Sequence, residues 1–278
     1  MQPLIFTPCS VPGRVLNTYN RCKMKSYNGG KSGSGTYQQI INHIPPHSIY
    51  VAPFAGHDGI FRNIRRATIS ILNDIDIDIA NWWKAQKIKN CIMVEDFMQG
   101  NLFERPTRPV VIIRNNDYAY ILKKFGNNPD AFIYCDPPYP METRKDKRRI
   151  YKYDWKYQTH HEHFLELINS ECKANLMVSS YPNQLYNTWL STWHTHRFYS
   201  TIRGGRRVEE IIYMNYPPPT ILHDFRYLGK DYRERENIKN KVNRHTERLN
   251  RLPQHERTAI LSSFIQQYKD TVEKLIAI

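Results

Sequence analysis

The sequence has no apolar stretch long enough to cross a membrane. Its longest apolar runs, such as PVVII and AFIYC, fall far short of the about 20 residues that a spanning helix needs. Its first residues, MQPLIFTPCSVPGR, lack the ordered regions of a secretory signal. Cysteine is scarce and scattered, at Cys9, Cys22, Cys91, Cys135 and Cys172. Because these residues form no CxxC pair, they argue against a zinc site or a disulfide framework and favour a reducing, cytoplasmic location.

Acidic residues are also in short supply. The 278 residues include 26 Asp and Glu against 40 Lys and Arg, which gives a formal net charge of +14. Hydrophobic residues make up 40% and aromatic residues 13%, so the chain can bury a sizeable core. The positive excess predicts a polyanionic partner, and nucleic acid is favoured over an acidic membrane because the sequence shows no basic amphipathic anchor.

Short apolar segments alternate with segments of helical spacing. IYVAPF, TISIL, PVVIIR, AFIYC and ANLMVS are predicted strands, and IDIANWWKAQ, DYAYILKKF and HHEHFLELIN are predicted helices between them. This alternation predicts an α/β fold with a mostly parallel sheet covered on both faces. WHTHRFYS and EEIIYMNY, joined by TIRGGRRV, predict a hairpin whose last strand runs antiparallel.

We expect three regions: an N-terminal extension over residues 1–22, a core over 23–217 and a basic C-terminal helical region over 218–278. In the last region Glu and Arg often lie three or four residues apart, which leaves a salt-bridged packing helix and a DNA-clamping helix equally open. The Trp82-Trp83 pair is predicted to lie in the core. His160, His161 and His163 are predicted to lie on a helix surface rather than to bind a metal.

The strongest chemical signal is Asp136-Pro137-Pro138-Tyr139, directly after the strand AFIYC. Ligands of open α/β sheets bind beyond the carboxyl ends of the strands, and two prolines hold a rigid turn there. A ring amine is a poor nucleophile because its lone pair is delocalised. Asp136 and the Pro137 carbonyl can each accept one of its N–H bonds, which frees the lone pair for attack. The segment predicts a site for a planar amine on whose ring Tyr139 stacks; a surface acid opening a proline turn is the alternative.

Other strand ends are polar as well. FAGHDGIF follows the first strand, and its glycine turn either lets the backbone approach a cofactor or is an ordinary turn. Asp74 ends the second strand, where dinucleotide folds place the acceptor of ribose hydroxyls, and Asp76 is placed to cap the next helix. Asp117 is either a site residue or a helix N-cap.

The order and spacing of these motifs resemble those of Dam-type DNA adenine-N6 methyltransferases, especially the compact phage and prophage members, over roughly residues 23–252. The matching segments are YNGGK, FAGHDGIF, ILNDID, YCDPPY, ETRKDKRRIYKYDW, SSYPNQLY, RGGRR with EEIIYMNY, and HDFRYLGKDYRERENIKNKV. The resemblance implies a Rossmann-like, S-adenosylmethionine-dependent methyltransferase fold. It also implies methylation of the adenine N6 amino group in double-stranded DNA with base flipping, without a metal, in a restriction-modification, phage-protection or orphan role. Oligomeric state is not indicated.

The resemblance also assigns site residues. It implies that Asp136 to Tyr139, including Pro137 and Pro138, bind the flipped adenine. It implies cofactor contacts by Tyr27 and Asp117 near the cofactor adenine, Lys31 toward its methionine end, Phe54 and Gly56 at the turn, and Asp74 at the ribose hydroxyls.

Two departures from the family pattern stand out. Asp58 occupies the position of the second glycine in FxGxG, where an acid would crowd or repel the carboxylate of the cofactor unless the turn is shifted by one residue. About eighty residues separate the glycine motif from Asp136, so little chain is left for a separate base-reading domain.

Other loops must then contact the DNA. The loops after AFIYC and WHTHRFYS should share one edge of the sheet, and their basic groups suit phosphate contact. The predicted DNA-binding residues are Arg144, Lys145, Lys147, Arg148, Arg149, Tyr151, Arg203, Arg206 and Arg207. Tyr151 or Tyr153 is a candidate for filling the gap that a flipped base leaves, and Trp155 is a further stacking candidate. Solvated basic loops are the alternative.

Two other functions remain open at this point. Methylation of RNA adenine uses the same chemistry. A nucleic-acid-binding protein with an impaired cofactor pocket is the alternative that Asp58 suggests.

Overall fold

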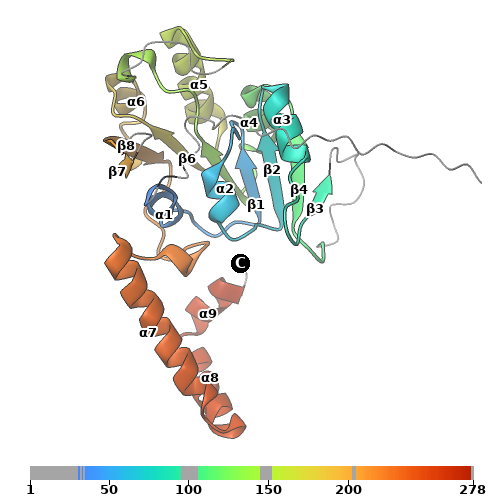
Figure 1. Cartoon of the computed structure of the whole chain (residues 1–278), viewed down its shortest axis with the longest axis vertical. Coiled ribbons are helices and arrows are strands. Elements are labelled where there is room, and N and C mark those ends of the chain that lie inside the picture. Colours follow the sequence, from blue (N-terminus) through green and yellow to red (C-terminus); the bar gives the residue numbers. More distant parts are fainter. Residues whose placement is uncertain are drawn as a thin grey trace, which may run out of the picture.

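The fold is built on one eight-stranded sheet. The structure is a computed structural model that describes residues 31, 33, 35–94, 106–144, 152–201 and 205–276. Its strands are β1 (Ile49–Ala52), β2 (Ile69–Asn73), β3 (Ile92–Val94), β4 (Val110–Arg114), β5 (Ala131–Cys135), β6 (Asn175–Ser180), β7 (His194–Thr201) and β8 (Arg207–Met214). They lie in the order β3-β4-β2-β1-β5-β6-β8-β7 (Figure 1).

All the strand pairs from β3 to β6 are parallel, and β8 runs antiparallel to both β6 and β7. The predicted mostly parallel sheet and its antiparallel last strand are therefore confirmed. Because β8 lies between β6 and β7, the carboxyl end of β7 faces the same edge as those of β1, β2, β4, β5 and β6. This mostly parallel, helix-covered sheet has the Rossmann-like arrangement that was expected.

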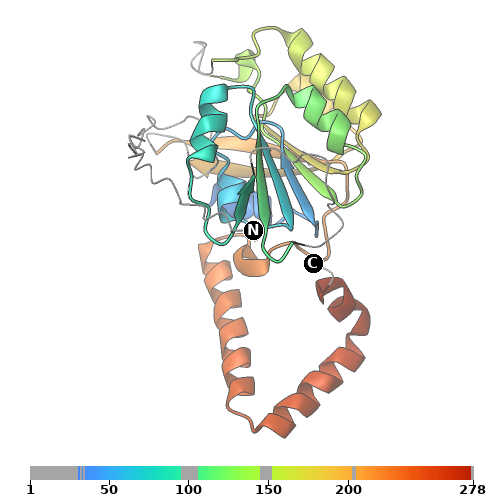
Figure 2. The ribbon, with the colours of Figure 1, turned by 90° about the vertical axis from the view of Figure 1, so that its right-hand side faces the viewer.

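Helices cover both faces of the sheet (Figures 1 and 2). One apolar layer holds side chains of α1 (Thr36–Ile41), α2 (Gly59–Asn63) and α3 (Ile77–Lys84). The other layer holds side chains of α4 (Tyr118–Phe125), α5 (Gln158–Glu171) and α6 (Gln184–Trp189). Alternation along β1 shows why: Tyr50 and Ala52 belong to the first layer and Val51 to the second.

Two predictions about single side chains have different outcomes. Trp83 is buried, and its indole N–H donates to the Gly56 carbonyl at 2.8 Å, so its core position is confirmed. The surface position of the three histidines is wrong for His161, which is buried and bonded through Nδ1 to the Tyr186 hydroxyl at 3.1 Å. The helical face of α5 turns this residue inward together with Phe164 and Leu165.

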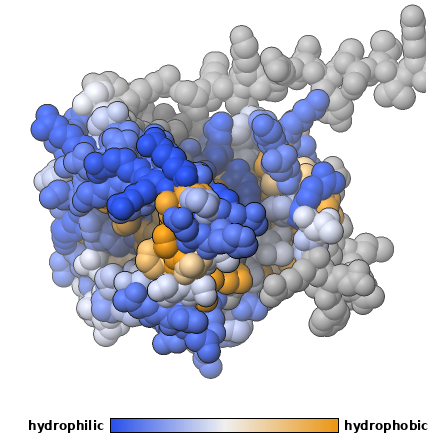
Figure 3. All heavy atoms as spheres, turned by 90° about the horizontal axis from the view of Figure 1, so that it is seen from below, coloured by the Kyte–Doolittle hydropathy of each residue, from blue (hydrophilic) through white to orange (hydrophobic). Residues whose placement is uncertain are grey.

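The C-terminal helices extend away from the sheet. Two short 3-10 turns lie in loops: η1 (Met141–Thr143) after β5 and η2 (Phe225–Tyr227) after β8. After η2 the chain forms α7 (Tyr232–Asn250), α8 (Gln254–Gln267) and α9 (Lys269–Ile276). Figure 2 shows α7 leading away from the core and α8 and α9 returning toward it. None of the three helices has a buried residue, and Figure 3 shows apolar surface within a hydrophilic surround at this end of the molecule. Among the described residues, no helix is long and apolar enough to span a bilayer.

Candidate active site

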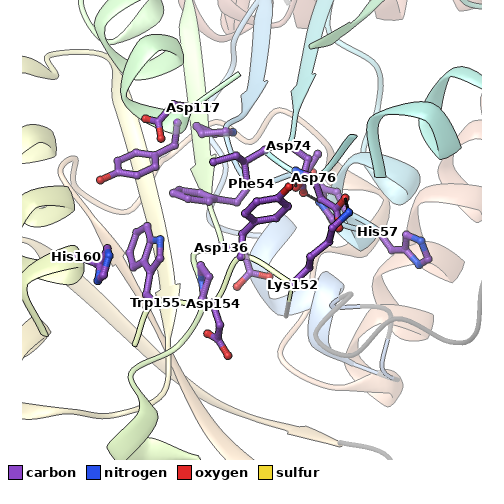
Figure 4. Close-up of a pocket in the computed structure, with 18 of the residues that line it drawn as sticks. Phe54, His57, Asp74, Asp76, Asp117, Asp136, Lys152, Asp154, Trp155 and His160 are labelled. Atoms are coloured by element: carbon purple, nitrogen blue, oxygen red, sulfur yellow. Dashed lines mark hydrogen bonds and ion pairs between the residues drawn. The ribbon is translucent and has the colours of Figure 1, made fainter. Parts of the chain in front are cut away.

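The carboxyl ends of the parallel strands open into a cavity of about 540 Å³. Loops after β1, β2, β4 and β5 line it, together with residues 152–155 and the start of α5 (Figure 4). Asn73 joins three of these loops: its amide group donates to the Pro53 and Asn116 carbonyls, and its Oδ1 accepts from the Asn116 N–H. The predicted meeting of strand-end residues at one edge is therefore observed.

The glycine turn after β1 is held by Asp58. Gly56 has a φ of 41°, which glycine adopts without strain. Asp58 is 7% exposed and caps α2: its Oδ1 accepts from the N–H groups of Ile60 at 2.8 Å and Phe61 at 2.9 Å. Its Oδ2 accepts from the Tyr50 hydroxyl at 2.8 Å. The acid that replaces the second glycine is therefore engaged with its own turn, although it still lines the cavity.

Asp74 fixes the turn from the neighbouring strand. It accepts from the Gly56 N–H at 2.8 Å and from the Asp76 N–H at 2.9 Å. Burial raises the pKa of Asp74 to about 6, against the opposing effect of these two hydrogen bonds. Asp76 caps α3 as predicted. Asp117 caps α4 by accepting from the Ala119 N–H at 2.7 Å, and it also lines the cavity. Its N-cap role is confirmed, and its cofactor contact stays a prediction.

Aromatic rings form one wall of the cavity. The Phe54 ring stacks on Tyr118 at 5.1 Å and meets Trp155 edge-on at 5.6 Å. Trp155 is 9% exposed and also packs on Phe164, so its predicted role as a stacking surface for DNA is wrong. Its position among these apolar rings makes it part of the pocket wall.

The Asp136 motif lies at the rim of the same cavity. Asp136 follows β5, and its Oδ1 accepts from the Ser179 hydroxyl at 2.8 Å. Burial raises the pKa of Asp136, and the nearby Lys31 ammonium opposes this shift. The Tyr139 ring meets Tyr181 edge-on at 4.5 Å.

Lys31 lies against this motif. Its Nζ is 3.2 Å from Asp136 Oδ1 and 3.2 Å from Glu210 Oε2, and it donates to the Tyr139 hydroxyl. The residue was expected near the methionine end of the cofactor; it lines the cavity, with its ammonium at the Asp136 motif. Glu210 was not singled out from the sequence. The alternation of apolar residues could not show which of Glu209 and Glu210 points toward the site, because β8 places apolar side chains on both faces of the sheet.

Arg144 does not project toward solvent, so its predicted phosphate contact is wrong. It is 7% exposed, and its guanidinium donates to both oxygens of Asp154, at 2.6 and 2.7 Å. It also donates to the Tyr139 carbonyl. A bidentate pair of this kind is rigid, so Arg144 holds the loop after Tyr139 in place.

The remaining predicted DNA contacts are only partly described. Arg206 and Arg207 are exposed near the carboxyl end of β7, and the Arg207 guanidinium lies 5.1 Å from the centre of the Tyr199 ring. The following predicted site residues lie outside the described residues: Tyr27, Lys145, Lys147, Arg148, Arg149, Tyr151 and Arg203.

Residues 101–203 match the family model of the D12 class N6 adenine-specific DNA methyltransferases. The match covers 103 of the 278 residues, so the similarity to this class is established for that segment. A domain of this class takes its methyl group from S-adenosylmethionine, which agrees with the fold and with the cavity beside Asp136. The resemblance to Dam-type enzymes is thereby confirmed.

Solved structures similar to this chain have low sequence identity. They include PH0851 (10% identity, TM-score 0.39, 68% of this chain and 46% of the other) and a SAM-dependent methyltransferase from Agrobacterium tumefaciens (13%, 0.37, 64% and 58%). A third is magnesium protoporphyrin IX methyltransferase from Synechocystis PCC 6803 with bound SAM (11%, 0.36, 66% and 76%). The chain thus spans about half the length of the first two. Comparison with curated proteins gives no match.

Proposed function

We propose that this protein methylates the N6 amino group of an adenine that leaves the base stack of double-stranded DNA. The observation that carries the proposal is that Asp136 and the turn formed by Phe54, Gly56 and Asp74 line one cavity. A nucleoside cofactor and a planar amine can therefore meet there. The domain division at residues 22 and 217 and a cytoplasmic location remain predictions.

The residues around the cavity fit S-adenosylmethionine. The Phe54 and Tyr118 rings offer an apolar wall for an adenine, and Asp74 offers carboxylate oxygens for ribose hydroxyls. Asp117 lies near that wall. When bound, the cofactor supplies an electrophilic methyl group on a cationic sulfur, which keeps the electron pair of the broken carbon–sulfur bond.

Asp136 and the Pro137 carbonyl act on the target adenine. Each accepts one N6 hydrogen bond, which draws the nitrogen away from conjugation with the ring and frees its lone pair for the new carbon–nitrogen bond. The nitrogen then loses one proton to the Asp136 carboxylate, from which it passes to water. Burial raises the pKa of Asp136, which favours this transfer.

Basic side chains at the edge of the sheet suit the DNA backbone. A groove of about 460 Å³ runs along β7 toward the start of α7, and Arg197, Arg207, Lys230 and Arg235 line it. Its one lining acid, Asp231, caps α7 by accepting from the Glu234 N–H at 2.8 Å. We therefore place flanking phosphates along Arg206, Arg207 and this groove. The predicted contacts in residues 145–151 and at Arg203 lie outside the described residues and remain predictions.

The sharpest test is expression in a host without DNA methylation, followed by single-molecule sequencing of its DNA. We expect N6-methyladenine in a short sequence context with the native chain. The Asp136→Ala variant should yield none, yet bind cofactor and DNA. Unmodified DNA together with N6-methyladenine in RNA would instead establish the RNA alternative. If the purified protein bound DNA but failed to bind millimolar S-adenosylmethionine, it would be a binding protein with an impaired pocket.

A further inference from the structure

Two carboxylates share one ammonium at the catalytic motif. Lys31 Nζ lies 3.2 Å from Asp136 Oδ1 and 3.2 Å from Glu210 Oε2. The side chains of Lys31 and Glu210 are 6% and 5% exposed, whereas that of Asp136 is 18% exposed. Asp136 is thus the carboxylate of the two that has access to the cavity, and Glu210 lies behind it.

The Glu210 carboxylate is held firmly. It accepts hydrogen bonds from the Ser200 hydroxyl through Oε1 and from the Tyr139 hydroxyl at 3.3 Å through Oε2. Its strand, β8, is paired on both sides, by β6 and β7. A buried acid with this many partners has a fixed place.

We propose that Glu210 is a positioning residue that acts through Lys31 and keeps the net charge of the catalytic cluster at −1. The inference rests on the proposed function. Without Glu210, the Lys31 ammonium would neutralise Asp136, and the pair would present no net charge to the cavity. With Glu210, one negative charge remains for the cationic sulfur of the cofactor and for the positive charge that develops on N6 during transfer.

The magnitude of this effect depends on burial. Charges interact several times more strongly in a partly desolvated site than in water, because the effective dielectric is lower there. Removing one preorganised electrostatic contact from an active site commonly slows the chemical step by about 10²-fold or more. A residue that never touches the substrate can therefore change both ligand preference and rate.

The test uses Glu210→Gln, which keeps the shape of the side chain and removes its charge. Calorimetry should show that the preference for cationic S-adenosylmethionine over neutral S-adenosylhomocysteine falls by about threefold or more. Single-turnover transfer at saturating cofactor should slow by about tenfold or more. Glu209→Gln is the matched control: it removes the same charge one residue away, where the side chain pairs with Arg197, and should change neither quantity.

A double variant separates charge from structure. Lys31→Met with Glu210→Gln restores a net charge of −1, so it should transfer methyl faster than Glu210→Gln alone at saturating cofactor. If the double variant is slower still, or if the ligand preference of Glu210→Gln equals that of the native chain, the proposal is wrong. Should Glu210→Gln fail to fold, the double variant carries the ligand-preference measurement against the native chain. In it the Asp136 carboxylate keeps the hydrogen bond from the Ser179 hydroxyl. An equal preference supports the proposal and a lost one opposes it.

Failure of the proposed function would look different. A native chain that binds S-adenosylmethionine but methylates no DNA would refute the proposed substrate. The comparison of the two cofactor forms would still decide the role of Glu210, since it needs no DNA.

Discussion

The titration of Asp58 gives a prediction with a definite sign. Burial raises its pKa to about 6 from the ordinary value of 3.8, even though Phe61, Tyr50 and Ile60 donate hydrogen bonds to it. Between pH 3.8 and about 6, the unfolded chain has released the Asp58 proton, whereas the folded chain still holds it. The free energy of unfolding therefore falls as the pH rises through this range. The difference of about two pKa units corresponds to about 3 kcal/mol in the free energy of unfolding, about half of which falls between pH 5 and pH 7.5.

Asp58→Asn removes this titration and keeps the cap, because Asn and Asp are about equally good N-cap residues. We expect the native chain to lose about 1–2 kcal/mol more stability than this variant between pH 5 and pH 7.5. Urea unfolding at the two pH values measures the difference, and Asp74, which titrates in both proteins, cancels. Parallel stability profiles of the two proteins would refute the reasoning.

Asp58→Gly tests the same residue against the cofactor. It restores the second glycine of the family motif, but the Asp58 carboxylate is occupied by α2 and Tyr50 rather than directed at a ligand. We therefore expect the affinity for S-adenosylmethionine to change by less than about threefold, which is under 1 kcal/mol. A gain of about tenfold in calorimetry would show that the acid does oppose the cofactor.

Three further predictions concern the cavity and its surroundings. Arg144→Ala leaves the buried Asp154 carboxylate without this partner and should lower the free energy of unfolding in urea by about 3–5 kcal/mol. Arg144→Met combined with Asp154→Leu removes both charges and should lower it clearly less. Equal losses in the two proteins would contradict this account of the pair. The affinity for S-adenosylmethionine should increase as the pH rises through about 6, because Asp74 accepts ribose hydroxyls better when ionised. Asp74→Asn should flatten that part of the calorimetric pH profile. An unchanged profile would exclude Asp74 as the cause. Arg206→Ala and Arg207→Ala should each reduce the slope of log affinity against log salt by about 0.9 in DNA-binding anisotropy, with cofactor affinity unchanged; slopes equal to that of the native chain would place the phosphates elsewhere.

Much of the fold could be predicted because its strands are apolar and bounded by turns. The seven strands expected from the sequence are present within a few residues, and Asp76 caps its helix as its position indicated. Strand β3 was not expected, since it has three half-buried residues at the sheet edge and little pattern. The predicted helical region over 218–278 contains three helices in the described residues, and Tyr268 separates α8 from α9.

The site was harder to predict where long-range pairing decides the environment. Arg144 stood in a basic run and was read as a phosphate contact, but a carboxylate ten residues later pairs with it inside the protein. Asp58 looked like an obstacle because local sequence does not reveal Tyr50 as its partner. In each case the deciding contact joins residues whose proximity exists only in the folded chain.

The position of β8 has a consequence for the order in which the enzyme becomes competent. The cluster of Lys31, Asp136 and Glu210 spans most of the chain, and its last member enters the sheet only when β8 pairs between β6 and β7. A chain that ends before β8 lacks Glu210 and the strand that pairs with both β6 and β7. Under the proposed role of Glu210, the charge of the cluster is complete only when the sheet is complete, and chains truncated before β8 should be weak modifiers of DNA.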